Sequence, residues 1–478
     1  MDTDWTRLGA AVAPAASAHP GRSGFHALWD ARDAFASRML LIEAAEATLD
    51  IQYYIWRLDR TGTLMFDAVR RAAERGVRVR LLLDDNNTPG LDAVLAALDS
   101  HPNVAVRLFN PFRLRAARWI GYLTDFRRMN RRMHNKSFTA DGQATIIGGR
   151  NIGDEYFGAD DGLLFSDLDV LAVGPVAGEV SADFERYWAS ESSCPAQRIL
   201  RPAAPGRLDA LEASASRVRS DSAAAAYLSA AKGSGFVKSL LDGVLPLEWA
   251  PVRMVSDDPA KGLGMVDEGS LLFNRLVSHM EGPRKQLDLV SPYFVPGEQG
   301  VAALTALAER GVRVRVLLNS LEATDVKVVH AGYVKRRRSL LEAGVRLFES
   351  KLEAAPVGKG TRAGLRGSSM SSLHAKTFAV DQCRVFVGSF NFDPRSAHLN
   401  TELGFVIDSE SLAARLSGVF DEQVPGNAYE ACLAQDGGLY WLERRDGSTV
   451  QHRSEPGAGI WQRAIVWLVS LLPVDWLL

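Results

Sequence analysis

Two copies of one histidine–lysine pattern are the residues of this sequence best suited to chemistry. Both copies read H-x-K-x-x-x-x-D, and both are followed by G-x-x-N at the same distance from the histidine. Their members are His134, Lys136, Asp141 and Asn151 in the first copy, and His374, Lys376, Asp381 and Asn391 in the second. Because two chance matches with the same spacing are rare, we treat the copies as one functional set.

Each copy is predicted to lie on a β-hairpin. Residues 137–140 and 377–380 are typical of short strands, and residues 144–148 and 384–388 are typical of the strands that return beside them. Since alternate residues of a strand face the same side, the histidine and the lysine of each copy point together. The return strand then brings the asparagine alongside them.

Two such sets that face each other would form a site for phosphate chemistry. One imidazole can attack phosphorus and form a covalent phosphohistidine, while the other protonates the leaving alkoxide and then acts as a base on the incoming alcohol or water. The groups expected to stabilise the non-bridging oxygens are Lys136, Lys376, Asn151, Asn391 and Ser389. This chemistry needs no cofactor and no metal, and the sequence shows no histidine or carboxylate cluster that would supply a metal site.

The elements that must position these motifs are also repeated. The segment A-E-R-G-V-R-V-R-L-L-L at 73–83 recurs as A-E-R-G-V-R-V-R-V-L-L at 308–318. An extended apolar run that opens with Leu-Asp precedes each segment, at 49–56 and 287–294. Each unit is typical of strand, helix and strand, with a glycine where a helix C-cap belongs, and therefore predicts a βαβ pattern and an α/β fold.

These motifs resemble the phospholipase D superfamily over about residues 40–410. The resemblance implies two α/β halves packed about a pseudo-twofold axis, with the site at their junction. It also implies a carboxylate behind each histidine, which fixes the tautomer of the ring, and Glu402 and Asp167 fit this role. Asp141 and Asp381 belong to the motif and are expected to be structural, buried and hydrogen-bonded.

The predicted domains follow from the repeat. We expect an N-terminal phospholipase D-like domain at 20–198, a connector at 199–248, a second such domain at 249–440 and a tail at 441–478. The connector is rich in Ala, Ser and Arg and shows no clear strand pattern, so it is predicted to be helical or loose.

Within the superfamily, several stretches resemble the bacterial cardiolipin synthases, in the branch that lacks N-terminal membrane spans. They include Q-Y-Y-I-W at 52–56, G-G-R-N-I-G-D-E-Y-F at 148–157 and V-H-A-G-Y at 329–333. The first half departs from the usual G-S-x-N because Gly149 stands where the second half has Ser389. One hydroxyl contact to phosphate is therefore expected to be missing or replaced by backbone.

Four further residues are candidates for substrate binding. Tyr54 and Tyr293 end predicted strands that point toward the site, with core packing as the alternative. His330 stands near several lysines and arginines and could bind a headgroup or lie on a helix surface. Arg150 could point away from the site or contact an anionic headgroup.

Composition disfavours several function classes. The 478 residues carry a net charge of −2, which argues against a generally basic nucleic-acid binder. No secretion signal opens the sequence and no apolar run is long enough to span a membrane. The three cysteines fit a reducing compartment. We therefore expect a cytoplasmic enzyme that is peripheral on the inner face of the bacterial cell membrane.

Two segments are candidates for the membrane contact. Residues 112–133 carry seven arginines among aromatic and aliphatic side chains, which suits an anionic surface. A solvated helix whose arginines pair with acids elsewhere is the alternative. Residues 460–478 carry three tryptophans, which favour a membrane interface, and a packed tail is the alternative there.

The expected activity is cardiolipin synthesis by phosphatidyl transfer. The donor is phosphatidylglycerol or phosphatidylethanolamine, and a hydroxyl of phosphatidylglycerol resolves the phosphohistidine. His134 is taken as the nucleophile, with His374 open as the alternative. The rivals are a phospholipase D that hydrolyses headgroups, a phosphodiesterase or nuclease, and a lipid-binding scaffold with vestigial motifs. A requirement for an accessory protein stays open.

Overall fold

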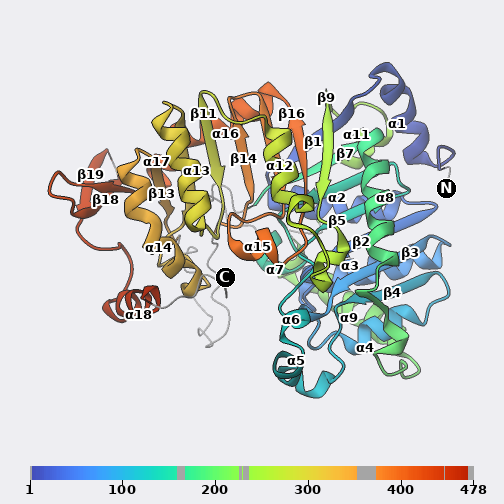
Figure 1. The fold of residues 1–478 in the computed structure, drawn as a ribbon. Coiled ribbons are helices and arrows are strands. Elements are labelled where there is room, and N and C mark those ends of the chain that lie inside the picture. The colour runs from blue at the N-terminus through green and yellow to red at the C-terminus, as the bar shows by residue number, and fades with distance from the viewer. Residues whose placement is uncertain are drawn as a thin grey trace.

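The computed structural model describes residues 3–158, 167–225, 229, 236–352, 373–445 and 447–471. Within them the chain forms two α/β halves, each built on one mixed sheet. Figure 1 shows the two sheets side by side, with the N-terminal half in blue to green and the C-terminal half in yellow to red.

The first sheet belongs to the N-terminal half. Its strands are β1 (Ser23–Leu28), β2 (Thr48–Tyr53), β3 (Arg78–Asp84), β4 (Val104–Phe109), β5 (Ser137–Ala140), β6 (Ala144–Gly148), β7 (Asp169–Val173), β8 (Ser193–Pro195) and β9 (Glu248–Ala250). Their order across the sheet is β8-β4-β3-β2-β5-β6-β7-β1-β9. Strands β2, β3 and β4 are parallel, and the other neighbours are antiparallel.

The second sheet belongs to the C-terminal half. Its strands are β10 (Val252–Ser256), β11 (Gln286–Val290), β12 (Arg313–Asn319), β13 (Arg346–Ser350), β14 (Thr377–Val380), β15 (Arg384–Gly388), β16 (Leu403–Asp408), β17 (Ala428–Leu433), β18 (Leu439–Arg445) and β19 (Ser448–His452). Their order is β10-β16-β15-β14-β11-β12-β13-β17-β18-β19. Strands β11, β12 and β13 are parallel.

The central strands of the two sheets correspond one to one. The order β4-β3-β2-β5-β6-β7-β1 in the first sheet matches β13-β12-β11-β14-β15-β16-β10 in the second. The three parallel strands occupy the same places in both. This correspondence confirms the predicted α/β fold of two similar halves about a pseudo-twofold axis.

Helices cover the sheets and complete the three largest hydrophobic cores of the described residues. The first half contains α1 (Arg7–Ala18), α2 (Ala31–Ala44), α3 (Arg60–Glu74), α4 (Asp92–Asp99), α5 (Trp119–Thr124), α6 (Phe126–Met129), α7 (Asp154–Phe157) and α8 (Pro175–Ala189), followed by α9 (Arg207–Ser220) and α11 (Phe236–Leu241). The second contains α12 (Leu272–Met280), α13 (Gly297–Glu309), α14 (Lys327–Glu342), α15 (Pro394–His398), α16 (Glu410–Glu422), α17 (Val424–Asn427) and α18 (Ile460–Ser470). Helices α2, α3 and α4 pack in one core, and α12, α13 and α14 in its counterpart. A third core is shared by both halves and includes side chains of β6, β7, β15, β16, α8 and α16.

The two predicted hairpins are present with the expected strands, β5–β6 and β14–β15. Asp141 and Asp381 begin their turns at positive φ, 53° and 51°. The carboxylate of Asp141 accepts the backbone N–H of Ala47 and of Thr48 at 2.8 Å, and Asp381 accepts those of Lys285 and Gln286 in the same way. Each turn is thereby tied to the start of the neighbouring strand, β2 or β11.

The segments outside the two central sheets differ partly from expectation. In the connector, α9 packs against α3 and α4. The tail expected from residue 441 instead begins within the second sheet, because β18 pairs with β17 and β19 pairs with β18. Among the described residues, α18 is the one helix that follows them. The boundaries 20–198 and 249–440 stay predictions.

Candidate active site

The segment that carries His134 is held by chain of the other half. The backbone N–H of His134 donates to the carbonyl of Thr401 at 2.9 Å, and that of Thr401 donates to Arg132 at 2.9 Å. Arg132 is 1% exposed and its guanidinium donates to both carboxylate oxygens of Asp84, at the end of β3, at 3.0 Å. A buried ion pair in one half and a strand-like contact with the other therefore fix this histidine.

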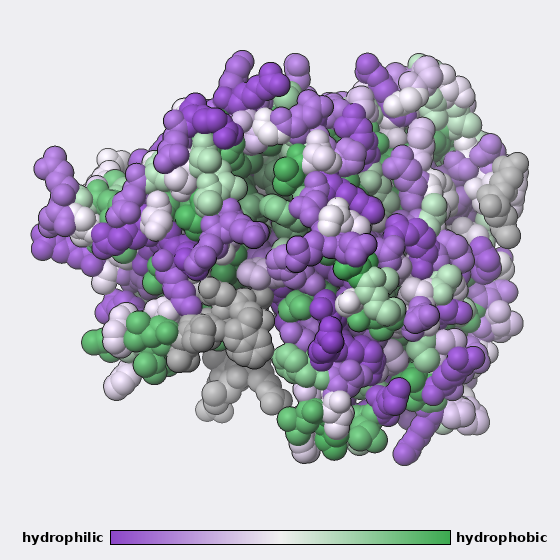
Figure 2. All heavy atoms as spheres, viewed as in Figure 1, coloured by the Kyte–Doolittle hydropathy of each residue, from purple (hydrophilic) through white to green (hydrophobic). Residues whose placement is uncertain are grey.

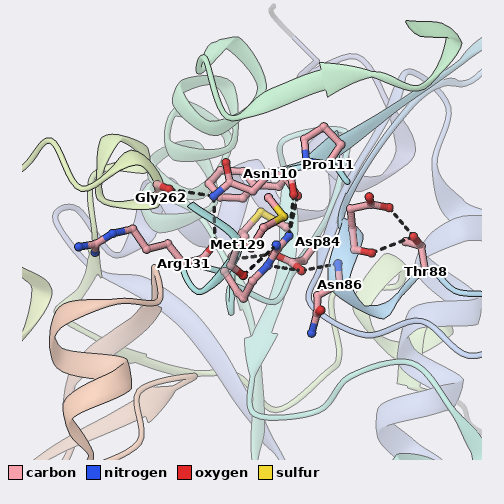
Figure 3. Close-up of polar contacts among 12 residues, drawn as sticks. Asp84, Asn86, Thr88, Asn110, Pro111, Met129, Arg131 and Gly262 are labelled. Atoms are coloured by element: carbon pink, nitrogen blue, oxygen red, sulfur yellow. Dashed lines mark hydrogen bonds and ion pairs between the residues drawn. The ribbon is translucent and has the colours of Figure 1, made fainter. Parts of the chain in front are cut away.

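Asn110 links the same segment to the second half. Its φ of 45° lies in the left-handed region, which asparagine tolerates better than most residues. Its side-chain amide donates to the carbonyl of Arg131 at 2.9 Å and to that of Gly262 at 2.8 Å. Figure 3 shows this amide between the two segments.

The two histidines are oriented by carboxylates that cross between the halves. Nδ1 of His134 lies 2.8 Å from Oε2 of Glu402, in the second half. Nδ1 of His374 lies 2.6 Å from Oδ2 of Asp167, in the first. Each ring therefore has Nδ1 engaged by a buried carboxylate, which leaves Nε2 as the nitrogen for chemistry.

Two buried lysines supply positive charge beside the rings. Lys136 and Lys376 are each 1% exposed, and each Nζ donates to the carbonyl of the histidine two residues earlier, at 2.7 Å for Lys136. Burial and then the charge of Lys376 lower the pKa of Lys136 to about 7. Burial lowers the pKa of Lys376 to about 8, although Asp167 and Glu402 oppose the shift. In the described part of the chain, no group of three His, Cys, Asp or Glu side chains is placed to hold a metal ion.

The electrostatics of the two histidine–carboxylate pairs differ. Burial, followed by the charges of Lys136, Lys376 and His374, holds the pKa of His134 well below its usual value. Burial and Lys376 lower the pKa of His374 as well, while Asp167 opposes this. Burial raises the pKa of Glu402 to about 7. Burial also acts to raise the pKa of Asp167, but the charge and hydrogen bond of His374, together with the charges of Lys376 and Arg150, lower it to about 2.

Comparison with known proteins agrees with this duplicated architecture. Residues 39–188 and 276–424, more than half of the chain, match the family model described as cardiolipin synthase, PLD-like domain. The chain belongs to this family. The two matched ranges hold one histidine–lysine motif each, so the PLD-like family model covers both halves of the site.

Individual relatives extend the match over the whole chain. Cardiolipin synthase C of Escherichia coli (strain K12) is 50% identical over 472 residues, which cover 99% of this chain and 100% of that protein. A cardiolipin synthase of Halalkalibacterium halodurans is 26% identical over 82% of this chain and 64% of its own length. The crystal structure of phosphatidylserine synthase from Haemophilus influenzae Rd KW20 has the same fold, with a TM-score of 0.61 at 13% identity and 99% coverage of both chains.

A polar network behind Glu402 involves residues beyond the PLD-like motif. The Oγ of Ser396 donates to Oε1 of Glu402 at 2.8 Å, and Asp257 accepts the backbone N–H of Glu402 at 3.0 Å. Ser389 is 0% exposed and its hydroxyl also donates to Glu402. The structure thus differs from our expectation that Ser389 contacts phosphate oxygens, since its hydroxyl donates to the carboxylate of Glu402 instead. Lys261 neutralises Asp257 at 2.8 Å.

The departure from G-S-x-N in the first half has a steric cause. A Cβ at Gly149 would lie 2.0 Å from Oδ1 of Asp167, so no serine fits there while Asp167 keeps its place. Arg150, next to it, is 0% exposed and donates to the carbonyls of Leu28, Trp29 and Asp167 at 2.8–3.0 Å. A headgroup contact by Arg150 is therefore wrong; its guanidinium supports the segment that carries Asp167.

The two asparagines of the PLD-like motif are buried beside the site but are not equivalent. Oδ1 of Asn151 accepts the backbone N–H of Ile55 at 3.2 Å. Oδ1 of Asn391 is buried and has no hydrogen-bond partner among the described residues. The amide of Asn391 is thus the less committed of the two and the better placed to reorient toward a ligand.

Tyrosines surround the histidine pair. The ring of Tyr54 meets His134 edge-on at 4.9 Å, and Tyr156 meets His374 in the same way at 5.3 Å. Tyr293 donates to Asp325 at 2.8 Å, and the charges of Tyr156 and Tyr54 contribute to raising its pKa, after burial and Asp325. Sequence reasoning missed Tyr156, whose only signal was its place in the G-G-R-N-I-G-D-E-Y-F stretch.

His330 does not fit the role of a headgroup ligand. It is 3% exposed, and Nε2 lies 3.3 Å from Oε1 of Glu455. The same oxygen accepts from Arg337 at 2.8 Å, and Arg337 also pairs with Glu349. Both expected positions of His330, at a headgroup and on a helix surface, are wrong, because this cluster buries it between α14 and the chain that leads to α18.

Proposed function

We propose that the chain is a cardiolipin synthase that transfers a phosphatidyl group between phospholipids through a covalent phosphohistidine, with lysines rather than a metal balancing the phosphate charge. The crossed pairing carries this proposal, because it gives two oriented imidazoles beside two buried lysines. The 50% identity to a protein named cardiolipin synthase C supports cardiolipin as the product.

In the first step, Nε2 of one histidine attacks phosphorus of the donor phospholipid. The P–N bond forms, the P–O bond to the headgroup breaks, and the second histidine passes its Nε2 proton to the leaving oxygen. Lys136 and Lys376 stabilise the charge on the non-bridging oxygens.

In the second step, the second histidine removes the proton of an acceptor hydroxyl. The oxygen of that hydroxyl attacks phosphorus, a new P–O bond forms and the P–N bond breaks, so both rings return to their starting state. With phosphatidylglycerol as acceptor, the product is cardiolipin.

We assign His134 as the nucleophile and His374 as the acid and base. The side chain of His134 is 8% exposed and its pKa is held well below the usual value, which favours a neutral ring ready to attack. The side chain of His374 is 22% exposed, and the ionised Asp167 behind it favours the imidazolium that must donate a proton.

A phosphodiester with a nitrophenol leaving group tests this assignment, because such a leaving group needs no protonation. His374→Ala should release about one nitrophenolate per chain as a burst and retain phosphorus covalently, since only the second step needs the base. His134→Ala should show neither the burst nor the bound phosphorus. The reverse pattern would exchange the two roles, and no covalent phosphorus in any variant or in the wild type would refute the intermediate.

The lipid substrates are tested with vesicles of labelled phosphatidylglycerol, with and without phosphatidylethanolamine. Cardiolipin with released glycerol or ethanolamine supports the proposed transfer and identifies the donor, and the reaction repeated with a cell extract tests for an accessory protein. Phosphatidic acid without cardiolipin would favour a hydrolase, and cleavage of DNA alone a nuclease. His398 is exposed, so His398→Ala is the matched control for the two histidine variants and should keep wild-type activity.

We further propose that the enzyme works as a peripheral protein on the inner face of the bacterial cell membrane. Across the described ranges, none of the helices combines the length and the apolar character that a bilayer crossing requires. Fractionation of cells should recover the chain with membranes, and alkaline carbonate should release it. Retention after that wash would contradict peripheral attachment.

A further inference from the structure

Two groups of exposed apolar side chains stand at one edge of the molecule. The α5 projection comprises Leu114, Trp119, Leu123 and Phe126, which are 43–75% exposed. The α18 projection comprises Ile460, Trp461, Ile465, Trp467, Leu468 and Leu471, which are 50–79% exposed. Figure 1 places α5 and α18 along the lower edge of the view, and Figure 2 shows apolar surface at both positions.

We propose that the α5 and α18 projections together form a docking face for an anionic phospholipid bilayer, on which both insert at the same time. This inference rests on the proposed function, which requires substrates that reside in a bilayer, and it states how the histidine pair is brought to them.

The α5 projection leads directly into the segment that positions His134. The chain runs from Phe126 through α6 to Arg132, whose ion pair with Asp84 anchors it. On α5 itself, Tyr122 donates to Asn86 at 2.8 Å, and the charge of Tyr54 contributes to raising the Tyr122 pKa after burial. This projection is therefore tied to Asn86, two residues after the Asp84 that anchors the segment of His134.

The α18 projection is fixed on the second half. The buried side of α18 packs on α14 and its neighbours, since Val466 joins Leu321 and Ala331 in one cluster and Val469 contacts another. At the start of α14, Val326 and Val328 are each 37% exposed and flank the exposed Lys327. They follow Asp325, the partner of Tyr293. The helix that holds α18 thus begins with apolar side chains next to the partner of Tyr293.

The arginine-rich segment contributes less charge than its sequence suggests. Arg115 and Arg118 pair with Asp85 and Asp92. Arg128 pairs with Asp125, and Arg132 with Asp84. The proposed docking face therefore relies on apolar side chains and on the exposed Arg113 and Arg127 rather than on all seven arginines.

A lipid surface is the occupant that suits the remaining chemistry. Arg113 and Arg127 are exposed at the α5 projection and Lys327 beside the α18 projection, so both carry cations next to apolar groups. Three exposed tryptophans, Trp119, Trp461 and Trp467, belong to the residue type that prefers the membrane interface. Cations beside such side chains complement an anionic headgroup layer over an acyl boundary.

The test is binding to vesicles by the full chain, without turnover. The variants are Leu123→Glu/Phe126→Glu for the α5 projection and Trp467→Glu/Leu468→Glu for the α18 projection. Val277→Glu on α12, where the valine is 54% exposed, is the matched control. Vesicles of phosphatidylglycerol with phosphatidylcholine are compared with vesicles of phosphatidylcholine alone, and melting temperatures report folding.

Each double variant should lower binding to anionic vesicles by about tenfold or more, because a charge would have to enter the apolar layer. Combining them should abolish binding, since two inserted points reinforce each other. Val277→Glu should bind like the wild type, and all should bind neutral vesicles more weakly. Unchanged binding in a folded double variant, or equal binding to both vesicle types, would overturn the inference.

Different results would refute the docking face and the proposed function. A chain that binds vesicles through both projections but forms no cardiolipin contradicts the proposed function alone. A chain that forms cardiolipin while the double variants bind vesicles normally contradicts the docking face alone.

Discussion

At the scale of single residues, the two halves solve one problem with different side chains. Glu402 reaches His134 and receives the hydroxyls of Ser389 and Ser396, whereas the shorter Asp167 reaches His374 and requires a glycine beside it. The motif identified both histidines and both lysines because their spacing is local. The crossed pairing was beyond sequence reasoning, since it depends on how two separate sheets face each other.

Restoring the family serine in the first half should be harmful. Gly149→Ser would place Cβ on the carboxylate of Asp167, displace it from His374 and lower turnover by about 100-fold, the lower end of what a positioned acid–base contributes. The control is Gly178→Ala on α8, where an added Cβ meets nothing within 4 Å. Full activity in Gly149→Ser would mean that Asp167 does not position the ring.

Removing a catalytic lysine should not destabilise the fold. The pKa of Lys136 falls to about 7 in the folded chain, so the unfolded chain binds more protons between pH 7 and about 10.5. The contribution of Lys136 to the stability of the wild type therefore rises with pH across this window. Below pH 7 the full free-energy cost of burying its charge opposes folding. Lys136→Met should lose activity, melt no lower than the wild type at pH 7 and show a flatter pH dependence.

Lys261→Met is the matched comparison for that variant. Lys261 is equally buried but pairs with Asp257 at 2.8 Å, so its loss leaves a buried carboxylate without its opposite charge. Breaking such a pair typically costs about 3–5 kcal/mol, and a clearly lower melting temperature is expected. If both variants melted at the same temperature, the free-energy cost that we assign to the buried charge of Lys136 would be wrong.

At the scale of elements, the sequence repeat predicted those features that depend on a few neighbouring residues. The helix ends at Gly76 and Gly311 and both β-hairpins are present as expected, because capping and alternation act over a few residues. The pairing of residues 441–452 could not be predicted, since β18 is only partly buried, β19 is mostly exposed, and β18 pairs with the edge of β17, which belongs to the sheet of the distant PLD-like motif. The burial of His330 likewise depends on Glu455, far away in the sequence.

The aspartates of the hairpin turns should contribute unequally to stability. Each carboxylate accepts three backbone N–H groups, but Asp141 is 0% exposed whereas Asp381 is partly exposed. Asp141→Ala should cost about 2–3 kcal/mol of unfolding free energy, in the range of hydrogen bonds to charged groups, and Asp381→Ala less. Chemical denaturation of both variants checks the order, and a larger loss for Asp381→Ala would contradict it.

At the scale of the whole molecule, the site exists only at the junction of the halves. Each half contributes one lysine with a lowered pKa, and the shared core fixes the sheets against each other. This arrangement leaves positive charge that a bound anion would balance. The resemblance predicted the junction, but the contribution of each half could be assigned only from coordinates.

Inorganic phosphate should therefore stabilise the folded chain. The melting temperature should rise with phosphate concentration, by about 1 °C per kcal/mol of binding for a chain of 478 residues, and by more than in sodium chloride of equal ionic strength. The combined Lys136→Met and Lys376→Met variant should show no specific rise. An identical response to both salts in the wild type would contradict anion binding at the junction.

The exchange of carboxylates between the halves also limits how such a protein could arise. One half folded alone would carry a histidine without its carboxylate and a carboxylate without its histidine. Two identical units about a twofold axis would supply each other, so an ancestral single unit would have needed a partner copy to be active. Joining two units in one polypeptide removes that need and lets each copy accumulate its own changes, such as glycine on one side and serine on the other.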